Sequence, residues 1–244
     1  MIFLRTILSC LLFIIVQPCF AQGKTVLKKI IVDPSGKGDF KLIQAAINSL
    51  PDSSAAPRVI LIRKGIYREK IYIEKPNIVL QGEDVTKTIL VQSIARDQWR
   101  CLHNDDWGVA TLNIDANDIT LLNLTINNNF GFEWKEPVTI FCSSDTTTHK
   151  KTIQKNGHQM ALRTMNGTRM KAINCRFRSF GGDTVSPWNV TGGLFYFKDC
   201  IMEGGIDFYC PRGWLMPKIA GLFHIRVLLP YGMMARNIKI QKRF

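Results

Sequence analysis

Two aspartates stand in glycine-rich segments at a spacing that would bring their carboxylates together. Asp183 lies in the sequence GGDTVSPWN, and Asp207 lies 24 residues further on, in GGIDFYCPRGW. Two neighbouring carboxyl groups suit acyl transfer, because one can attack a carbonyl carbon while the other donates a proton to the leaving group. Mutual repulsion in such a pair keeps one group protonated while the other ionises.

Each aspartate also has a simpler explanation. Asp183 would fit a turn in which its side chain bonds the local backbone, and Asp207 would fit a buried acid satisfied by an arginine. Cys175 and Cys200 are 25 residues apart, nearly the same spacing, and each follows an Asn or Asp. A repeat of this size is about one coil of a parallel β-helix, whose strands lie about 4.8 Å apart. The shared register favours the chemical interpretation.

The elements that would position these acids are mostly short strands. Only 39–50, DFKLIQAAINSL, predicts a helix, with Asp39 as its N-cap and Pro51 just beyond its end. The absence of hairpin turns favours a parallel β-helix over a sandwich, with stacked strands from about 59 to 208. The strand-like runs are RVILIRKGIYREKIYIEK, NIVLQGE, TILVQ, ATLNIDANDITLLNLTINN, KAINCRFRSF and GLFYFKDCIMEGGIDFY.

The two ends of the chain differ from its centre. Residues 1–21 predict a secretory signal cleaved before Gln22, the alternative being an uncleaved membrane anchor. Residues 22–214 then form one domain, and 215–244 form a basic tail without acids or strand alternation. We expect a secreted or periplasmic protein that acts as a monomer, with no membrane contact after cleavage.

The composition of the chain limits the classes of partner that it is expected to bind. The net charge of +13 falls to +6 over 22–214, which suits an anionic polymer, although solvated surface charge is the preferred explanation. Basic residues do not interleave with aromatics, so nucleic acid is not expected. Five cysteines remain after signal cleavage, so at least one is unpaired, and their spacing predicts no metal site. No cofactor is expected.

Several blocks of the chain resemble the pectin methylesterase family. These are IVDPSGKGDFKLIQAAINSLP, RVILIRKGIYREKIYI, NIVLQGED, HQMALR, GGDT and GGIDFYC, so that the resemblance covers about 30–214. The resemblance implies a right-handed parallel β-helix that removes methyl groups from methyl-esterified pectin (homogalacturonan). It also implies that Asp207 is the nucleophile and that Asp183 is the general acid and later the base.

The chain departs from the family pattern around these acids. Gly182 replaces a glutamine that would donate to an oxyanion, a loss that costs about 3 kcal/mol in known cases. The other family glutamine corresponds to His158 without a gap, or to Gln159 if a bulge intervenes; strand alternation favours His158. Trp188 is a candidate sugar platform, with a core or turn role as the alternative. Arg212 is a candidate substrate-binding residue.

The tail is the largest departure. Family members continue with further coils and an Arg-x-Trp pair, whereas 215–244 does not resemble them, so we expect a reading-frame shift after Trp214 and little esterase activity in this product. The alternative function is a non-catalytic polysaccharide-binding β-helix in which the acids are structural. A Ca²⁺-dependent lyase is a third and weaker hypothesis, because HNDDW (103–107) is the only acidic cluster that could bind Ca²⁺ and a solvated loop explains that sequence.

Overall fold

The computed structural model describes residues 29–134, 136–205, 207–215, 225–228 and 236–238. The expected signal segment and most of the expected tail lie outside these residues. Within the described part of the chain, every helix is too short or too polar to cross a bilayer.

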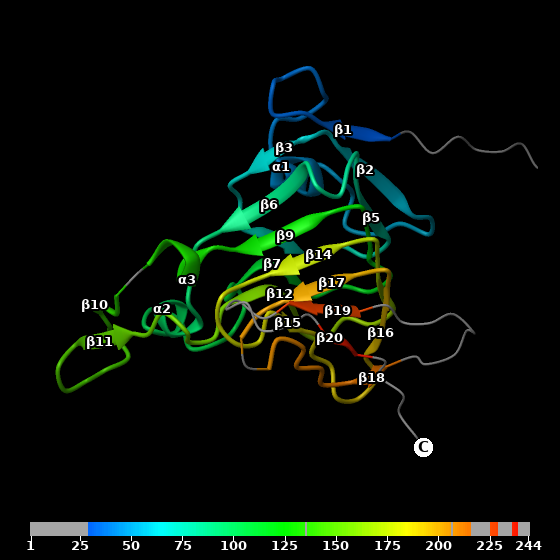
Figure 1. Cartoon of the computed structure of the whole chain (residues 1–244). Helices are drawn as coiled ribbons and strands as arrows, with labels where there is room; N and C mark the ends of the chain where they lie inside the picture. Colours follow the sequence, from blue (N-terminus) through cyan, green and yellow to red (C-terminus); the bar gives the residue numbers. More distant parts are fainter. Residues whose placement is uncertain (1–28, 135, 206, 216–224, 229–235, 239–244) are drawn as a thin grey trace, which may run out of the picture.

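The chain forms a right-handed parallel β-helix, as predicted, with its coils stacked along one axis (Figure 1). Each coil contributes a strand to up to three sheets. The first sheet contains β1 (Ile30–Val32), β2 (Arg58–Ile62), β5 (Ile78–Gly82), β8 (Thr120–Leu122), β13 (Met170–Ile173), β16 (Leu194–Lys198) and β18 (Trp214–Leu215). The second contains β3 (Gly65–Tyr67), β6 (Thr88–Gln92), β9 (Thr125–Asn128), β14 (Arg176–Arg178), β17 (Ile201–Glu203), β19 (Ile225–Leu228) and the antiparallel β20 (Arg236–Ile238). The third, which carries the candidate site, contains β4 (Ile71–Ile73), β7 (Ala110–Ile114), β12 (Met160–Thr164) and β15 (Val185–Ser186).

The corner between the first and second sheets explains the Asn-Cys and Asp-Cys pairs. Asn123, Asn174 and Asp199 occupy this corner in successive coils with φ of 53°, 51° and 52°. Asn and Asp tolerate this left-handed conformation, so that a single residue can turn the chain from the first sheet into the second. The residue that follows points into the core, so Cys175 and Cys200 are both 1% exposed and lie on adjacent coils. Their thiols interact but both are free, which confirms the predicted register.

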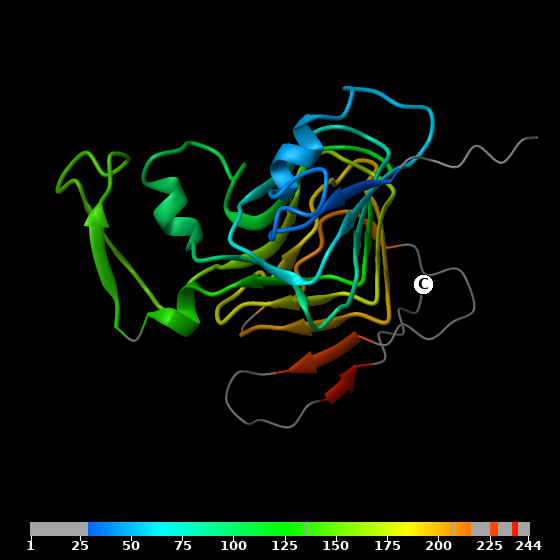
Figure 2. The same cartoon turned by 90° about the horizontal axis from the view of Figure 1, so that it is seen from above.

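The expected helix is shorter than 39–50. Helix α1 (Ile43–Asn48) covers the open end of the coils and buries Ile43, Ala46 and Ile47 (Figure 2). The predicted N-cap, Asp39, is wrong, because its carboxylate accepts a hydrogen bond from the Ile31 amide at 2.7 Å. The carboxylate of Glu69 caps the helix instead, accepting bonds from the Ile43 and Gln44 amides at 3.0 Å each. A contact distant in sequence therefore fixes where the helix begins.

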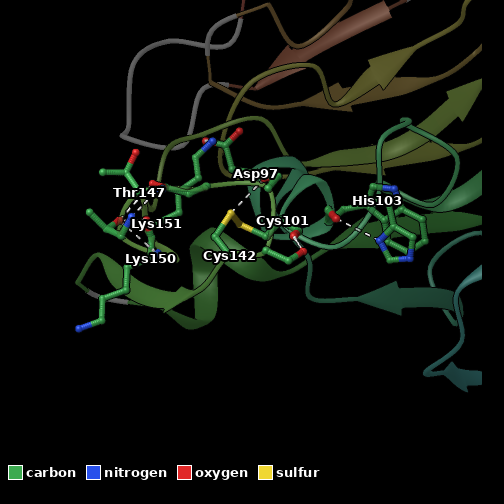
Figure 3. Close-up of a disulfide and its surroundings, with 12 residues drawn as sticks. Asp97, Cys101, His103, Cys142, Thr147, Lys150 and Lys151 are labelled. Atoms are coloured by element: carbon green, nitrogen blue, oxygen red, sulfur yellow. Dashed lines mark hydrogen bonds and ion pairs between the residues drawn. A yellow bond between two sulfur atoms is a disulfide. The ribbon is translucent and has the colours of Figure 1, made fainter.

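Two excursions from the coils lie on one side of the stack (Figure 2). The first carries helix α2 (Arg96–Arg100), and the second carries helix α3 (Phe130–Glu133) and an antiparallel hairpin of β10 (Val138–Phe141) and β11 (Lys150–Ile153). A disulfide between Cys101 and Cys142 joins them, and an ion pair of 3.4 Å between Lys151 and Asp97 lies nearby (Figure 3). Neither the hairpin nor this cysteine pairing was expected from the sequence.

Two described strands in the C-terminal part continue the stack. β18 pairs in parallel with β16, and β19 pairs in parallel with β17. The expectation that 215–244 is an aberrant tail stays a prediction, because most of that segment lies outside the described residues.

Candidate active site

The two aspartates occupy neighbouring coils at the edge of the third sheet. The amide of Asp183 donates a hydrogen bond to the carbonyl of Asp207 at 3.1 Å, so the two residues stand one strand spacing apart. Both adopt the left-handed conformation, with φ of 57° for Asp183 and 53° for Asp207. For residues with a Cβ this conformation is uncommon, and it is concentrated at turns and functional sites.

The pairing of the two segments continues on both sides of the aspartates. The Val185 amide donates to the Phe208 carbonyl at 2.9 Å, and the Cys210 amide donates to the Val185 carbonyl at 3.0 Å. The buried Thr184 hydroxyl holds the turn from below, because it bonds the Ser179 hydroxyl at 2.6 Å and the Glu203 carbonyl at 3.2 Å. The turn that carries Asp183 is therefore anchored in the core rather than left as a surface loop.

The two carboxylates differ in their surroundings. Asp207 is exposed, which differs from the buried acid considered above, and its side chain makes no hydrogen bond or ion pair with the described residues. The Asp183 side chain is only 16% exposed, and its Oδ2 lies 4.0 Å from Nε2 of His158. One carboxylate is thus open to a substrate, while the other is partly enclosed beside an imidazole.

The structure separates the two candidate oxyanion donors. His158 bridges to Gly182 on the next coil, and its side chain is 51% exposed beside Asp183. Gln159 is fully buried; its Oε1 accepts a bond from the Gly131 amide at 2.9 Å, and its Nε2 donates to the Lys155 carbonyl. Of the two, only His158 has a side chain beside the acids, as strand alternation favoured.

Trp188 and Arg212 lie together on the same two coils as the acids, a few residues further along each segment. The two residues form a bridge, and the Arg212 guanidinium lies 5.4 Å from the Trp188 ring. Arg212 also donates to the Cys210 sulfur at 3.3 Å and to the Pro211 carbonyl at 3.2 Å, and it forms no ion pair with Asp207 in the described part of the chain. Trp188 is 38% exposed, but the guanidinium of Arg163 covers it at 4.4 Å. A sugar therefore has at most part of this ring available.

A partly buried ionic cluster beside the site was missed from the sequence. Arg163 is 5% exposed; its Nη1 donates to the Ser186 hydroxyl at 2.9 Å, and its Nη2 lies 3.6 Å from Oδ2 of Asp106. Asp106 also forms a two-pronged bond with Arg96 at 3.0 and 3.2 Å. Burial lowers the pKa of Arg163, while the Asp106 charge opposes that shift. Arg163 ends the HQMALR block and Asp106 lies in HNDDW, but neither motif indicated that they meet.

Cys210 is a second residue that sequence reasoning missed. Its thiol lies beside Asp183, and burial together with that negative charge raises the pKa of the thiol, while Arg212 lowers it. A thiol in this environment stays protonated at neutral pH and is a weak donor rather than a nucleophile. Within the described chain, no three acidic, histidine or cysteine side chains gather as metal ligands would.

The fold and the aspartate pair define a class of protein, namely parallel β-helix proteins with two aspartates on successive coils. Comparison with known sequences agrees, because the family model described as Pectinesterase matches residues 29–170. The chain therefore belongs to the pectinesterase family.

Individual relatives extend the likeness over most of the described chain. The chain is 34% identical over 185 residues to "Putative pectinesterase 11" of Arabidopsis thaliana, covering 74% of this chain and 42% of that protein. Among solved structures, the pectin methylesterase PemA from Erwinia chrysanthemi is 29% identical with a TM-score of 0.60, covering 78% of this chain and 53% of that one. A pectin methylesterase solved in complex with a hexasaccharide is 29% identical with a TM-score of 0.58, covering 76% and 52%. The chain thus spans about half the length of these relatives, or less.

Proposed function

We propose that this chain carries the active site of an enzyme that hydrolyses the methyl esters of pectin, with Asp207 as nucleophile and Asp183 as general acid and base. The pairing of Asp183 with Asp207 on neighbouring coils, in a chain of the pectinesterase family, is the observation that carries the proposal. The exposed Asp207 suits attack on a polymer, and the partly enclosed Asp183 suits proton transfer.

The proposed reaction has two steps. The Asp207 carboxylate attacks the ester carbonyl, and the resulting oxyanion accepts a hydrogen bond from the His158 ring. Asp183 then donates its proton as the bond to methoxide breaks, which releases methanol and leaves an anhydride between galacturonate and Asp207. Asp183, now ionised, takes a proton from water, and the hydroxide attacks the anhydride. The anhydride bond then breaks, which returns Asp207 as a carboxylate and releases galacturonic acid, whose proton passes to solvent as it ionises, and Asp183 is protonated again.

The Cys101–Cys142 disulfide supports a site of action outside the cytoplasm. Disulfides persist in oxidising compartments and are rare in the reducing cytosol. We therefore propose that the protein works in the periplasm or outside the cell, where pectin is met.

One observation favours a second candidate, a polysaccharide-binding β-helix without catalysis. Asp207 forms no ion pair with the described residues, and Gly182 offers no side-chain donor. A carboxylate without a positioned cation is less well placed and less well stabilised as a nucleophile.

Methanol release from methyl-esterified pectin tests the choice. We expect Asp207→Asn and Asp183→Asn each to remove release by at least about 10³-fold, because each variant lacks a group that the reaction uses directly. Circular dichroism should show an unchanged β fold in both variants. Equal pectin binding by the parent chain and both variants, with no methanol from any of them, would favour the binding protein instead.

A further inference from the structure

The segment that carries Cys210 and Arg212 lies against the segment that follows Asp183. The Cys210 amide donates a hydrogen bond to the Val185 carbonyl at 3.0 Å, and the Arg212 amide donates to the Pro187 carbonyl at 2.7 Å. These backbone bonds place the Cys210 side chain beside the partly enclosed general acid. The reaction proposed above gives no task to Cys210 or to Arg212.

The Cys210 thiol takes part in two hydrogen bonds with partners of opposite charge. The Arg212 Nη1 donates to its sulfur at 3.3 Å, and the thiol also bonds the Asp183 side chain. A guanidinium can only donate and an ionised carboxylate can only accept. The sulfur therefore accepts from Arg212 while the S–H group donates to Asp183, so that the thiol lies between a cation and an acid.

Arg212 is exposed, yet further contacts hold its guanidinium near the sulfur. The same Nη1 donates to the Pro211 carbonyl at 3.2 Å, and the guanidinium lies 5.4 Å from the centre of the Trp188 ring. The bridge between Trp188 and Arg212 also pairs the backbone of the two residues. The positive charge thus stays close to the thiol.

The electrostatics of the thiol agree with this arrangement. Burial and the negative charge of Asp183 raise the pKa of the Cys210 thiol, while the charge of Arg212 opposes them. The raised pKa means that the S–H proton is present at neutral pH and can be donated. The two neighbours act on the thiol in opposite directions, which an experiment can separate.

Groups on neighbouring segments also face this pair. Nε2 of His158 lies 4.0 Å from Oδ2 of Asp183, and the ring is charged only when it is protonated. The Arg163 guanidinium is within electrostatic reach of both Asp183 and Cys210, and its Nη2 lies 3.6 Å from Oδ2 of Asp106. Asp106 therefore offsets part of the Arg163 charge, so the cation bonded to the thiol has the more direct route to Asp183.

Asp183 benefits from such support because its charge changes during the proposed reaction. It is protonated until methoxide leaves, and it is then ionised until water attacks the anhydride. A carboxylate offers about four acceptor positions, so a bond from the thiol leaves room for methanol and water. The thiol and the cation behind it interact most strongly with the ionised stage, in which the carboxylate carries a full negative charge.

We propose that Cys210 is a positioning residue of this active site, whose thiol holds the Asp183 carboxyl group and links it to the Arg212 guanidinium. Cys210 acts through Asp183 and does not touch the substrate. The inference deepens the proposed function and rests on it for the acid–base role of Asp183. The contact among the three side chains can be tested without a substrate.

Labelling of the thiol by iodoacetamide tests the contact directly, because the thiolate is the form that reacts. The labelling rate is measured against pH, and mass spectrometry separates Cys210 from the other cysteines. We expect Asp183→Asn to speed labelling at pH 8 about fivefold and Arg212→Gln to slow it about fivefold. Asp52→Asn is the control and should leave the rate unchanged, because the Asp52 side chain is 97% exposed near the first coils.

The opposite responses distinguish the contact from a loss of fold. Unfolding would expose the thiol and speed labelling in every variant, so slower labelling of Arg212→Gln cannot come from unfolding. Equal labelling rates for the parent chain and both charge variants would overturn the proposal, as would slower labelling of Asp183→Asn.

Methanol release then measures the positioning role. Cys210→Ala should lower kcat about tenfold with KM unchanged, and Cys210→Ser, which keeps a donor, should recover most of that loss. We expect Arg212→Gln to lower kcat less in the Cys210→Ala background than in the parent, because its charge acts through the thiol. Equal kcat for the parent and Cys210→Ala would overturn the positioning role. If the parent releases no methanol, the proposed function fails and the labelling result alone decides the contact.

Discussion

At the scale of single residues, we assign a chemical role to His158 and a structural role to its neighbour Gln159. The His158 ring lies 4.0 Å from the Asp183 carboxylate and is half exposed. The Gln159 amide is buried and bonds the backbone of two other segments, at Gly131 and Lys155. Substitutions at the two positions should therefore affect different measurements.

For His158 we predict a change in catalysis. His158→Ala removes the proposed oxyanion donor and should lower kcat about 10²-fold with little change in KM, since the bond forms mainly in the transition state. His158→Gln restores an amide donor and should recover most of that loss. If His158→Ala keeps the parent kcat, the ring has no part in stabilising the oxyanion.

For Gln159 we predict a change in stability. Gln159→Leu leaves the buried Gly131 amide without its acceptor, which should lower the free energy of unfolding by about 1–3 kcal/mol. Urea titration gives the value, with Gln154→Leu on the surface of the same excursion as the control. An unchanged urea midpoint would mean that another group satisfies the Gly131 amide.

At the scale of elements, the ends of helices and the excursions depend on contacts between distant segments. Helix α1 has no local side-chain cap, and the carboxylate of Glu69, which lies 26 and 25 residues after Ile43 and Gln44, accepts two bonds from their amides. The excursion with α2 is joined to the hairpin by the disulfide (Figure 3). Each contact can be removed by a small change.

Removing the helix cap should destabilise the covered end of the stack. Glu69→Ala leaves the Ile43 and Gln44 amides unsatisfied, and we expect a loss of about 1–2 kcal/mol in the free energy of unfolding. Asp52→Ala is the control, because the Asp52 side chain is 97% exposed and its ion pair with Lys75 adds little. Equal denaturation midpoints for the two variants would contradict a capping role for Glu69.

The disulfide should stabilise the excursions over a long loop. It closes a separation of 41 residues, for which the chain-entropy model gives about 4 kcal/mol. Cys101→Ser with Cys142→Ser should lower the melting temperature and speed proteolysis between α2 and β11. A reducing agent should have the same effect on the parent protein and none on the double variant. Identical proteolysis of all these forms would show that the excursions hold together without the bond.

At the scale of the whole molecule, stability comes from one core that runs along the stack. Each coil buries its apolar side chains only against its neighbours, so loss of packing in a middle coil affects both sides. Phe177 is fully buried and packs edge-on against Phe197 of the next coil, with ring centres 6.1 Å apart. Ring contacts of this kind between neighbouring coils help to hold the stack together.

Truncating this ring should weaken the whole domain. Phe177→Ala creates a cavity in the core, and we expect a cost of about 3–5 kcal/mol in the free energy of unfolding. Trp134→Ala, at a ring that is 43% exposed beside α3, should cost much less. Calorimetry would show one shifted transition for Phe177→Ala, whereas an unshifted transition would argue against a continuous core.

The sequence by itself determined the coil architecture and the register of the acids. Strand alternation and the 24–25-residue spacing are local and periodic signals, and the left-handed corners at Asn174 and Asp199 belong to single residues. These features need no knowledge of distant contacts, so the parallel stack and the adjacency of Cys175 and Cys200 could be predicted.

Only the tertiary structure decided how the remaining groups are used. The cap of α1 by Glu69, the Cys101–Cys142 pairing and the cluster of Asp106 with Arg163 all join segments 26 to 57 residues apart. No periodicity encodes such contacts, because they depend on how the excursions fold back onto the third sheet. The same reason explains why Asp207 proved exposed.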